Sequence, residues 1–259
     1  MPKVVQRNMP SPKEKALIIE NLTKKYNDVT AVDGLSLEVY KGELFGLLGP
    51  NGAGKTTTIN VLCGLIPPTS GSVKVGGYDV TKETSKVKAL IGVSPQETSI
   101  YAHLTGKENI EFFGNLHAMP KEKLKQNVKE LLEKLSLEED AKRRAGKYSG
   151  GMMRRINLAM ALVHDPDIAF LDEPTVGMDP QSRHAVWDFV KELKKRNKTV
   201  IVTTHYMEEA EELCDRVAII DHGKLIALGR PKQLKRKYKA KNLEDVFIQL
   251  TGRTIREGL

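Results

Sequence analysis

Short apolar runs alternate along this chain of 259 residues with longer stretches that have an apolar residue at every third or fourth position. Residues 43–48, 168–171 and 199–204 are mostly apolar or β-branched, which is typical of strands buried on both faces of a sheet. Residues 55–65 and those after Pro180 have the spacing of amphipathic helices. This alternation predicts an α/β fold with a mainly parallel core sheet.

Further strand signals flank this core. Residues 16–19 and 35–39 predict two strands near the N-terminus. Residues 217–220 and 224–227 predict a closing hairpin, with a turn at residues 221–223.

The stretch 105–145 differs from the rest, because it has helical spacing and no strand signal. We expect Thr105 to cap a helix that runs through Met119, and Pro120 to take the first position of the next helix. These features predict a helical subdomain, at about residues 97–158, inserted into the α/β body.

The net charge of +8 is concentrated near the two ends of the chain. Residues 1–15 carry +3 and residues 230–259 carry +6, so the body carries −1. We interpret the first segment as a flexible basic arm and the last as a basic helical tail. Nucleic-acid binding usually needs a basic face on the body, so no nucleic-acid partner is expected. The tail suits an anionic membrane surface or a protein partner, and a merely solvated tail is the alternative.

Composition excludes several classes of protein. Hydrophobic residues make up 40% of the chain, and no apolar run approaches the roughly 18 residues that span a bilayer. The first residues lack the apolar segment of a signal peptide. Cys63 and Cys214 are far apart, and the six histidines lack zinc-ligand spacing. These features indicate a globular protein of a reducing compartment.

The candidate chemistry begins directly after the first core strand. Residues 49–56 fit G-x-x-x-x-G-K-[ST], in which glycines let backbone N–H groups curl around a phosphate chain. Lys55 then places an ammonium on the outer phosphates, and the Thr56 hydroxyl can bind Mg²⁺. The alternative is a glycine-rich turn that binds nothing. The predicted nucleotide-binding residues of this loop are Gly49, Pro50, Asn51, Gly52, Ala53, Gly54, Lys55, Thr56 and Thr57.

Other polar residues follow predicted strands. Asp172 and Glu173 end a buried strand at the sheet edge where ligands of α/β proteins bind. Asp172 suits Mg²⁺ coordination, and Glu173 suits a general base for water. Gln96 lies on a loop and can contact a metal or a water. His205 can bind a γ-phosphate, although a histidine at a strand end is more often structural.

Two more candidates also have ordinary structural alternatives. Ser149, Gly150 and Gly151 stand at the start of a predicted helix, where they form either a second anion site or a simple cap. Tyr26 lies upstream of the glycine-rich loop, where its ring can stack on an adenine or serve only in packing.

In this order and spacing, the motifs resemble the ATP-binding subunit of ABC transporters over about residues 16–229. The resemblance implies a P-loop NTPase with an N-terminal antiparallel β subdomain, which hydrolyses ATP with Mg²⁺ in a dimer that holds two nucleotides head to tail. The implied roles are adenine stacking for Tyr26, phosphate binding for Gly49 to Thr57, metal contact for Thr56, Gln96 and Asp172, catalysis for Gln96, Glu173 and His205, and capping of the opposite subunit's γ-phosphate for Ser149, Gly150 and Gly151.

The chain departs from the family's commonest signature, LSGGQ, at two positions. Tyr148 replaces Leu and Met152 replaces Gln, so a polar contact is lost while Ser-Gly-Gly remains. Residues 177–179 resemble the D-loop, and Met178 there replaces Leu at nearly constant volume. The YSGGM signature and residues 243–247 are similar to a branch that mostly serves exporters of drugs, lipids or polysaccharides.

The family also implies partners. A separate transmembrane permease is expected to contact the helical subdomain and the Gln96 loop, and a second ATP-binding subunit, expected to be identical, completes the dimer. The protein is then expected in the cytoplasm, at the inner face of the cell membrane. An importer subunit is the main alternative, because it shares every catalytic element.

Two rival functions are less consistent with the sequence. An ABC-type ATPase acting on nucleic acid or the ribosome has either a long coiled coil or two ATPase units, whereas this chain has a short span from Gln96 to Ser149 and one unit. A sensor that binds nucleotide without turnover does not need both Asp172 and Glu173.

Overall fold

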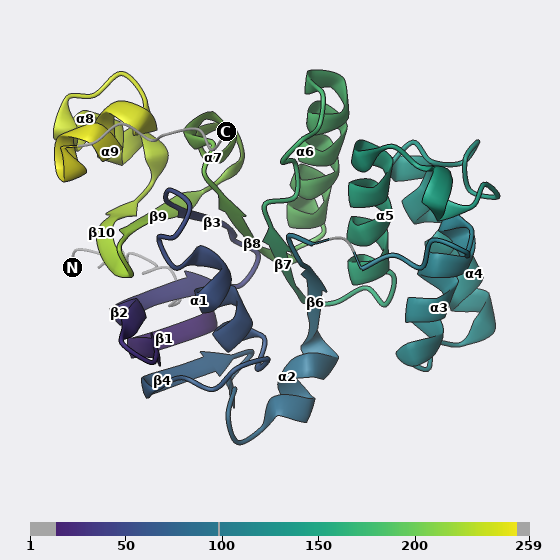
Figure 1. Ribbon diagram of the computed structural model, residues 1–259, viewed down its shortest axis with the longest axis horizontal. Coiled ribbons are helices and arrows are strands. Elements are labelled where there is room, and N and C mark those ends of the chain that lie inside the picture. The colour runs from purple at the N-terminus through teal and green to yellow at the C-terminus, as the bar shows by residue number, and fades with distance from the viewer. Residues whose placement is uncertain (1–13, 98, 253–259) are drawn as a thin grey trace, which may run out of the picture.

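The computed structural model describes residues 14–97 and 99–252, and its centre is a six-stranded sheet in the order β10-β9-β3-β8-β7-β6 (Figure 1). The strands from β9 to β6 are parallel, and β10 pairs antiparallel with β9 as the predicted hairpin. The bounds are Leu44–Leu48 for β3, Ile91–Ser94 for β6, Ile168–Asp172 for β7, Thr199–Thr204 for β8, Arg216–Asp221 for β9 and Lys224–Gly229 for β10. The predicted mainly parallel core sheet is confirmed.

The central sheet separates two hydrophobic cores. Strands β3, β7 and β8 are buried along their whole length, which explains their unbroken apolar runs. Leu44 and Leu48 of β3 belong to the core that the sheet forms with the helices after residue 105. Phe45 and Leu47, on the other face, join the core shared with the second sheet.

The second sheet is antiparallel, as expected for the N-terminal part, and has the order β2-β1-β4-β5. Its strands are β1 (Lys15–Tyr26), β2 (Val29–Tyr40), β4 (Ser70–Val75) and β5 (Tyr78–Asp79). The strands predicted at 16–19 and 35–39 are too short, since each belongs to a 12-residue strand. Register shifts, as between Ile19 and Leu22, interrupt the alternation that marks a strand in sequence. The expected basic arm lies outside the described residues up to residue 13, and Lys15 already belongs to β1.

Two helices pack near this second sheet. Helix α1 (Lys55–Leu62) follows the glycine-rich loop and ends three residues earlier than predicted, because Gly64 turns the chain with a φ of +65°. Helix α2 (Thr84–Leu90) is missing from the sequence prediction. Its seven residues bury only Val87, so no apolar periodicity marks it.

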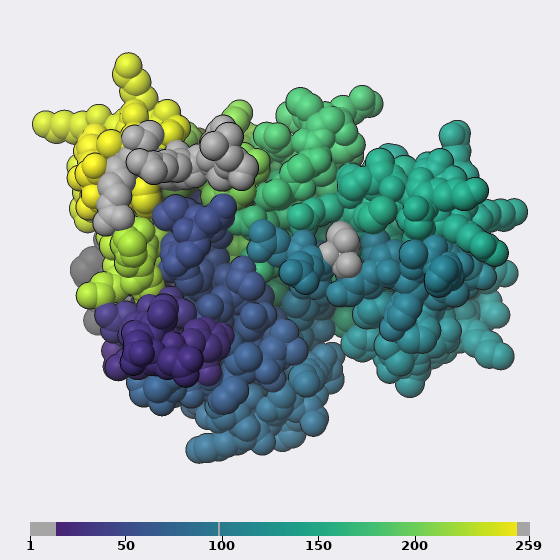
Figure 2. Space-filling model, in the orientation of Figure 1, coloured from purple at the N-terminus to yellow at the C-terminus, as the bar shows by residue number. Residues whose placement is uncertain are grey.

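Three helices and a 3-10 turn form a lobe at one end of the molecule, which Figures 1 and 2 show in teal. They are α3 (Gly106–Leu116), α4 (Lys121–Lys134), the turn Ala145–Lys147 and α5 (Gly150–Leu162). Thr105 caps α3 as predicted, in a capping box with Glu108. The predicted end at Met119 is wrong, because Ala118 adopts a left-handed conformation with a φ of +51°. Pro120 is the cap of α4 rather than its first residue.

The remaining helices are α6 (Pro180–Lys195), α7 (Met207–Leu213), α8 (Pro231–Tyr238) and α9 (Leu243–Thr251). In the basic tail, α9 packs on α7 and α8, and Lys235 of α8 pairs with Glu211 of α7. Contact of the tail with lipid or a partner stays a prediction. Within the described ranges, no helix combines the length and the apolar character required to cross a bilayer.

Candidate nucleotide-binding site

Four loops that follow neighbouring parallel strands meet at the carboxyl edge of the central sheet. The glycine-rich loop follows β3, Gln96 follows β6, Glu173 follows β7 and His205 follows β8. Because β3, β8, β7 and β6 are adjacent in this order, the four loops lie side by side. Open α/β sheets bind their ligands at this edge.

The glycine-rich loop requires glycine at two positions that other backbone segments approach closely. A Cβ atom on Gly49 would lie 2.3 Å from the carbonyl oxygen of Ile220, and one on Gly54 would lie 2.3 Å from that of Ala31. Gly54 also has a φ of +100°. The loop is therefore fixed between β2 and β9. Of its residues, Gly49, Ala53 and Lys55 are buried, Pro50, Gly54 and Thr57 are half-buried, and Asn51, Gly52 and Thr56 are exposed.

The Lys55 ammonium is buried within this loop, with an exposed fraction of 5%. Its Nζ donates to the carbonyl oxygens of Gly49 at 2.8 Å and Pro50 at 3.1 Å, and lies 3.3 Å from Oε1 of Glu173. Burial lowers the pKa of Lys55, and the charge of Glu173 offsets this only in part. A buried ammonium with mainly carbonyl partners fits an anion, because phosphate oxygens would supply the missing negative charge.

Glu173 connects the loops to one another. Its Oε1 lies 3.1 Å from Nδ1 of His205, and its Oε2 accepts a hydrogen bond from Nε2 of Gln96 at 3.2 Å. Burial alone raises the pKa of Glu173, but the hydrogen bond with His205 and the charge of Lys55 outweigh it and hold the pKa below its usual range. The carboxylate is therefore ionised at neutral pH, as a base must be before it accepts a proton from water.

Thr203 is a site residue that the sequence pattern does not single out. Its hydroxyl donates to Oδ1 of Asp172 and accepts a hydrogen bond from the N–H of Glu173 at 3.0 Å. That bond supports Glu173 in a left-handed conformation, with a φ of +50°, which strains a residue that carries a side chain. Thr203 stands opposite Asp172 in the pairing of β7 with β8. Only this register could have identified it.

The predicted adenine contact, Tyr26, lies at the end of β1. Its exposed fraction is 44%, and Nζ of Lys24 lies 5.1 Å from its ring centroid. The hairpin of β1 and β2 that carries Tyr26 also carries Ala31, whose carbonyl group packs on Gly54. An exposed ring on this hairpin is available for stacking on a base, and that role stays a prediction.

The Ser-Gly-Gly signature lies on the surface of the helical lobe. Ser149 is the cap of α5, where its hydroxyl accepts a hydrogen bond from the N–H of Met152 at 3.3 Å. Ser149 and Gly150 are exposed. Among the residues that the structure describes, no hydrogen bond or ion pair joins the signature to the glycine-rich loop. The signature is therefore open to contact with another molecule.

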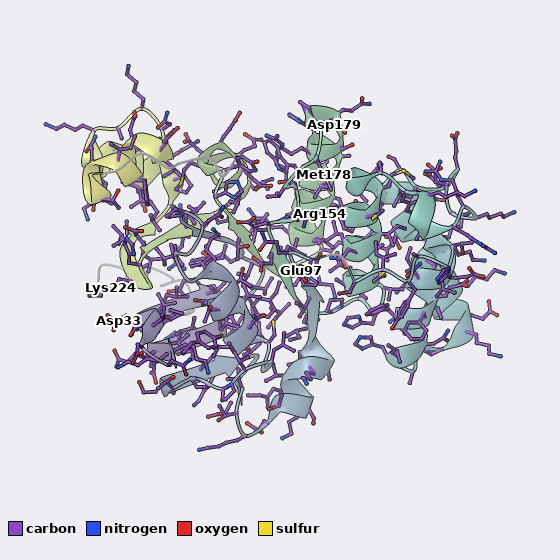
Figure 3. The ribbon with its side chains drawn as sticks, viewed as in Figure 1. Asp33, Glu97, Arg154, Met178, Asp179 and Lys224 are labelled. Atoms are coloured by element: carbon purple, nitrogen blue, oxygen red, sulfur yellow. The ribbon has the colours of Figure 1, made fainter. Side chains whose placement is uncertain are left out.

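A surface hollow lies between α5, which begins with the signature glycines, and the loop that carries Gln96. It is lined by Gln96, Glu97, Gly150, Met153, Arg154, Val176 and Gly177. Figure 3 labels Arg154 and Glu97 of this lining. A guanidinium nitrogen of Arg154 donates to the carbonyl oxygen of Gln96 at 2.6 Å. Helix α5 thus holds the backbone of Gln96, whose side chain contacts Glu173.

The residues expected to hold Mg²⁺ fit that ion chemically. Asp172 offers a carboxylate, Thr56 a hydroxyl and Gln96 an amide oxygen, and oxygen is the ligand that Mg²⁺ prefers. Asp172 is 2% exposed, and Thr203 fixes one of its oxygens. Residues 14–97 and 99–252 contain no cluster of three or more His, Cys, Asp or Glu side chains suited to a metal. Because Mg²⁺ prefers about six oxygen ligands, it would take phosphate and water oxygens besides these three side chains.

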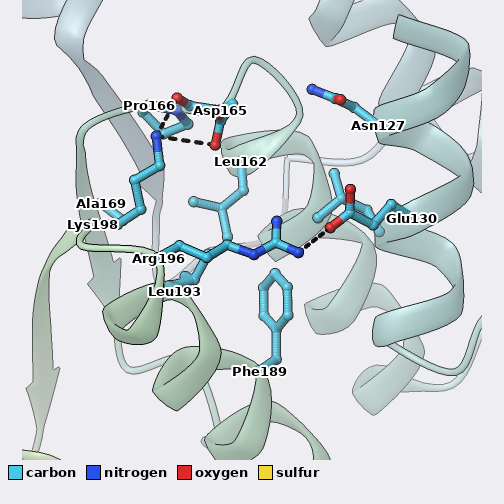
Figure 4. Close-up of a pocket in the computed structure, with 11 residues that line it drawn as sticks. Asn127, Glu130, Leu162, Asp165, Pro166, Ala169, Phe189, Leu193, Arg196 and Lys198 are labelled. Carbon is cyan, nitrogen blue, oxygen red and sulfur yellow. Dashed lines mark hydrogen bonds and ion pairs between the residues drawn. The ribbon is translucent and has the colours of Figure 1, made fainter. Parts of the chain in front are cut away.

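A further hollow lies away from these residues, between α4 and α6 (Figure 4). Arg196 pairs across it with Glu130, and Nζ of Lys198 lies 3.1 Å from Oδ1 of Asp165. These charged groups are paired with one another and leave no charge for a ligand. We interpret the hollow as the junction of the helical lobe with α6.

The loop geometry, the buried lysine and the ionised carboxylate define a P-loop protein that binds nucleoside triphosphates. The family model described as ABC transporter matches residues 32–176. The chain belongs to the ABC transporter family, which confirms the prediction made from its motifs.

Three relatives illustrate where the chain falls within this family. It is 48% identical over 238 residues to the linearmycin resistance ATP-binding protein LnrL of Bacillus subtilis, covering 92% of this chain and 75% of LnrL. It is 42% identical over 244 residues to the doxorubicin resistance ATP-binding protein DrrA of Mycobacterium tuberculosis, covering 93% of this chain and 72% of DrrA. It is 44% identical over 221 residues to the Nod factor export ATP-binding protein I of Paraburkholderia xenovorans, covering 85% of this chain and 73% of that protein.

Solved structures agree with this assignment. The ATP-binding subunit of an ABC transporter superposes with a TM-score of 0.84 at 25% identity, covering 91% of this chain and 99% of that one. The dimeric ATP-binding cassette MJ0796, in a post-hydrolysis state bound to ADP and Pi, superposes with a TM-score of 0.76 at 27% identity. The match covers 83% of this chain and 98% of that one. The predicted P-loop fold and transporter ATPase are confirmed, and the resistance and export relatives favour the exporter branch over the importer alternative.

Proposed function

We propose that this chain hydrolyses ATP in a dimer of identical subunits and so powers an exporter whose transmembrane permease is a separate chain. The observation that carries the proposal is the Glu173 carboxylate, which lies between Lys55, Gln96 and His205. The relatives named for drug resistance and Nod factor export support an export function.

The glycine-rich loop, residues 49–57, holds the phosphates in this proposal. Lys55 exchanges its carbonyl partners for phosphate oxygens, and the added negative charge raises the pKa that burial has lowered. Thr56, Gln96 and Asp172 would hold Mg²⁺, which would supply positive charge to neutralise the phosphates. Tyr26 stacks on the adenine.

Glu173 is the general base for the attacking water. Its ionised carboxylate can accept the proton, and Thr203 holds its backbone in place. His205 keeps the carboxylate oriented through their 3.1 Å contact and faces the γ-phosphate. Gln96 restrains the other carboxylate oxygen.

The second subunit supplies the remaining groups. Ser149, Gly150 and Gly151 begin a helix of 13 residues, whose N-terminus attracts an anion. Because Ser149 and Gly150 are exposed and the signature is separate from its own glycine-rich loop, we assign them to the γ-phosphate held by the partner subunit. Each site is then complete only in the closed dimer.

Glu173→Gln tests this proposal directly. The amide cannot accept a proton, so turnover should fall roughly 10²–10⁴-fold while ATP binding is kept. Glu122→Gln, at an exposed position on α4, is the matched control. Phosphate release and equilibrium ATP binding measure the two properties. Wild-type turnover in the Glu173 variant would overturn the assignment.

We place the permease contact on α3 and the loop before it. Tyr101, Phe112 and Leu116 have exposed fractions of 52%, 38% and 66%. The rings of Tyr101 and Phe112 pack edge to face, with centroids 5.1 Å apart. Exposed apolar groups that cluster in this way mark interaction surfaces. The loop that carries Tyr101 also carries Gln96, so the contact lies close to the catalytic carboxylate.

Copurification tests this contact. Leu116→Asp should lower the amount of membrane permease that copurifies with the tagged chain, because a carboxylate replaces an apolar contact. Leu65→Asp is the control, since Leu65 is also exposed, at 58%, but lies after α1. Equal permease recovery with both variants would move the contact elsewhere.

The cellular location follows from this partner. Bound to its permease, the chain would lie at the inner face of the cell membrane and in contact with the cytoplasm. The body charge of −1 supports a function without nucleic acid.

A further inference from the structure

Glu209 is a buried carboxylate to which the proposed mechanism gives no role. It lies in the first turn of α7 and has an exposed fraction of 1%. Its Oε1 accepts hydrogen bonds from the Thr175 hydroxyl at 2.7 Å and from the indole N–H of Trp187 at 2.9 Å. Its Oε2 is buried and has no hydrogen-bond partner in the described part of the chain. Such burial costs free energy, which makes a mere packing role a poor explanation.

The two hydrogen bonds join segments that carry catalytic groups. Thr175 follows Glu173 by two residues, and Glu209 follows His205 by four. The bond from Thr175 to Glu209 is therefore a further link between two segments that are already joined by the contact of Glu173 with His205. The pairing of β7 with β8 and the bond from the Glu173 N–H to Thr203 hold the strand ends together, and the bond to Glu209 adds a restraint beyond the ends of these strands.

We propose that Glu209 is a positioning residue for ATP hydrolysis, which holds the Glu173 segment against the His205 segment through Thr175. This inference rests on the proposed function of Glu173 as the general base. Glu209 acts from α7, and Thr203 supports the same carboxylate segment from β8. The segment that contains the strained Glu173 backbone thus has one support from β8 and another from α7.

The chain offers a close control for Glu209. Glu208 lies in the same first turn of α7 but is exposed. Glu208→Gln therefore makes the same chemical change on the same helix without touching the buried link. Glu209→Gln keeps an acceptor oxygen but removes the charge and puts an amide NH₂ group in place of an oxygen that has no donor in the described part of the chain, so the link should shift. Thr175→Val removes the donor from the other side while keeping a similar shape.

Steady-state kinetics of the purified full chain test the proposal. Glu209→Gln and Thr175→Val should each lower kcat about ten-fold, equivalent to a barrier increase of roughly 1.4 kcal/mol, and leave KM for ATP nearly unchanged. The double variant should be no slower than the slower single variant, because both changes break the same link. Glu208→Gln should match the wild type.

Trp187 separates positioning from packing. Trp187→Phe removes the other hydrogen bond to Glu209 and should lower the melting temperature while leaving kcat nearly unchanged. Trp187 is the only tryptophan of the chain, so its fluorescence also reports whether the Glu209→Gln protein is folded. If that variant does not fold, Thr175→Val decides the question.

Three results would overturn the proposal. They are a kcat of Glu209→Gln equal to that of Glu208→Gln, losses that multiply in the double variant, and a kcat of Trp187→Phe that falls as far as that of Thr175→Val. A wild-type chain without ATP turnover would instead refute the proposed function.

Discussion

At the scale of single residues, the site depends on Asp172 and Glu173 and also on the side chains that hold these two carboxylates in place. The Thr203 hydroxyl contacts Asp172 and the backbone of Glu173, and it is fully buried. The positions of Asp172 and Glu173 at the sheet edge were predictable, because carboxylates at the end of a buried strand are a local pattern. The contacts of Thr203 and Glu209 were not predictable, because they depend on which strand and helix lie beside this segment in space.

Thr203→Val should weaken both the fold and the reaction. The change keeps the shape but leaves a buried Asp172 oxygen without its donor, which should lower the unfolding free energy by about 1–3 kcal/mol. Turnover should fall as well, because the backbone of Glu173 loses a support. Denaturant unfolding and phosphate release measure the two effects. Thr203→Ser keeps the hydroxyl and serves as the control, and equal stability of the two variants would contradict this role.

At the scale of elements, local signals determine which boundaries are predictable. Helix α6 begins at Pro180 and α5 begins after Ser149, as the sequence indicated. Both starts were predictable because the residues at a helix start determine its cap. Strand β1 runs far beyond the predicted 16–19, since its irregular pairing with β2 hides the alternation. Helix α2 escaped detection because a single buried side chain gives no period.

The capping box of α3 gives a prediction for one element. The Thr105 hydroxyl accepts from the N–H of Glu108 at 3.2 Å, and the Glu108 carboxylate accepts from the N–H of Thr105 at 2.7 Å. Thr105→Ala should lower the unfolding free energy by about 1 kcal/mol, the usual value of such a cap. Thermal unfolding measures this, with Thr105→Ser expected to remain near the wild type. An alanine variant as stable as the serine variant would show that packing alone holds α3.

At the scale of the whole molecule, the helical lobe meets the central sheet at a pair of histidines. The rings of His117 and His164 stack with centroids 3.6 Å apart, and Nε2 of His164 lies 3.0 Å from the carbonyl oxygen of Ile91 in β6. Burial and the neighbouring His117 lower the pKa of His164 to about 4. Both rings are therefore neutral at pH 7 and can stack without repulsion.

This junction should make stability depend on pH. The folded pKa of His164 lies below its ordinary value of 6.5, so the unfolded chain binds a proton first and stability is lost as the pH falls from about 6.5 toward 4. At pH 5 the loss due to His164 should be at most about 2 kcal/mol. Denaturant unfolding at pH 7.5 and pH 5 should show a smaller decrease for His164→Gln than for the wild type. Equal decreases would contradict the assignment.

The central claim is that the glycine-rich loop and the signature of a second copy enclose one ATP beside Glu173. A crystal structure of the Glu173→Gln protein with ATP and Mg²⁺ tests it most directly. We expect the triphosphate on residues 49–57, with Lys55 on its outer phosphates, Mg²⁺ at Asp172, and Ser149 of a second copy on the γ-phosphate. A triphosphate bound elsewhere, or a γ-phosphate without contact from a second copy, would contradict the account.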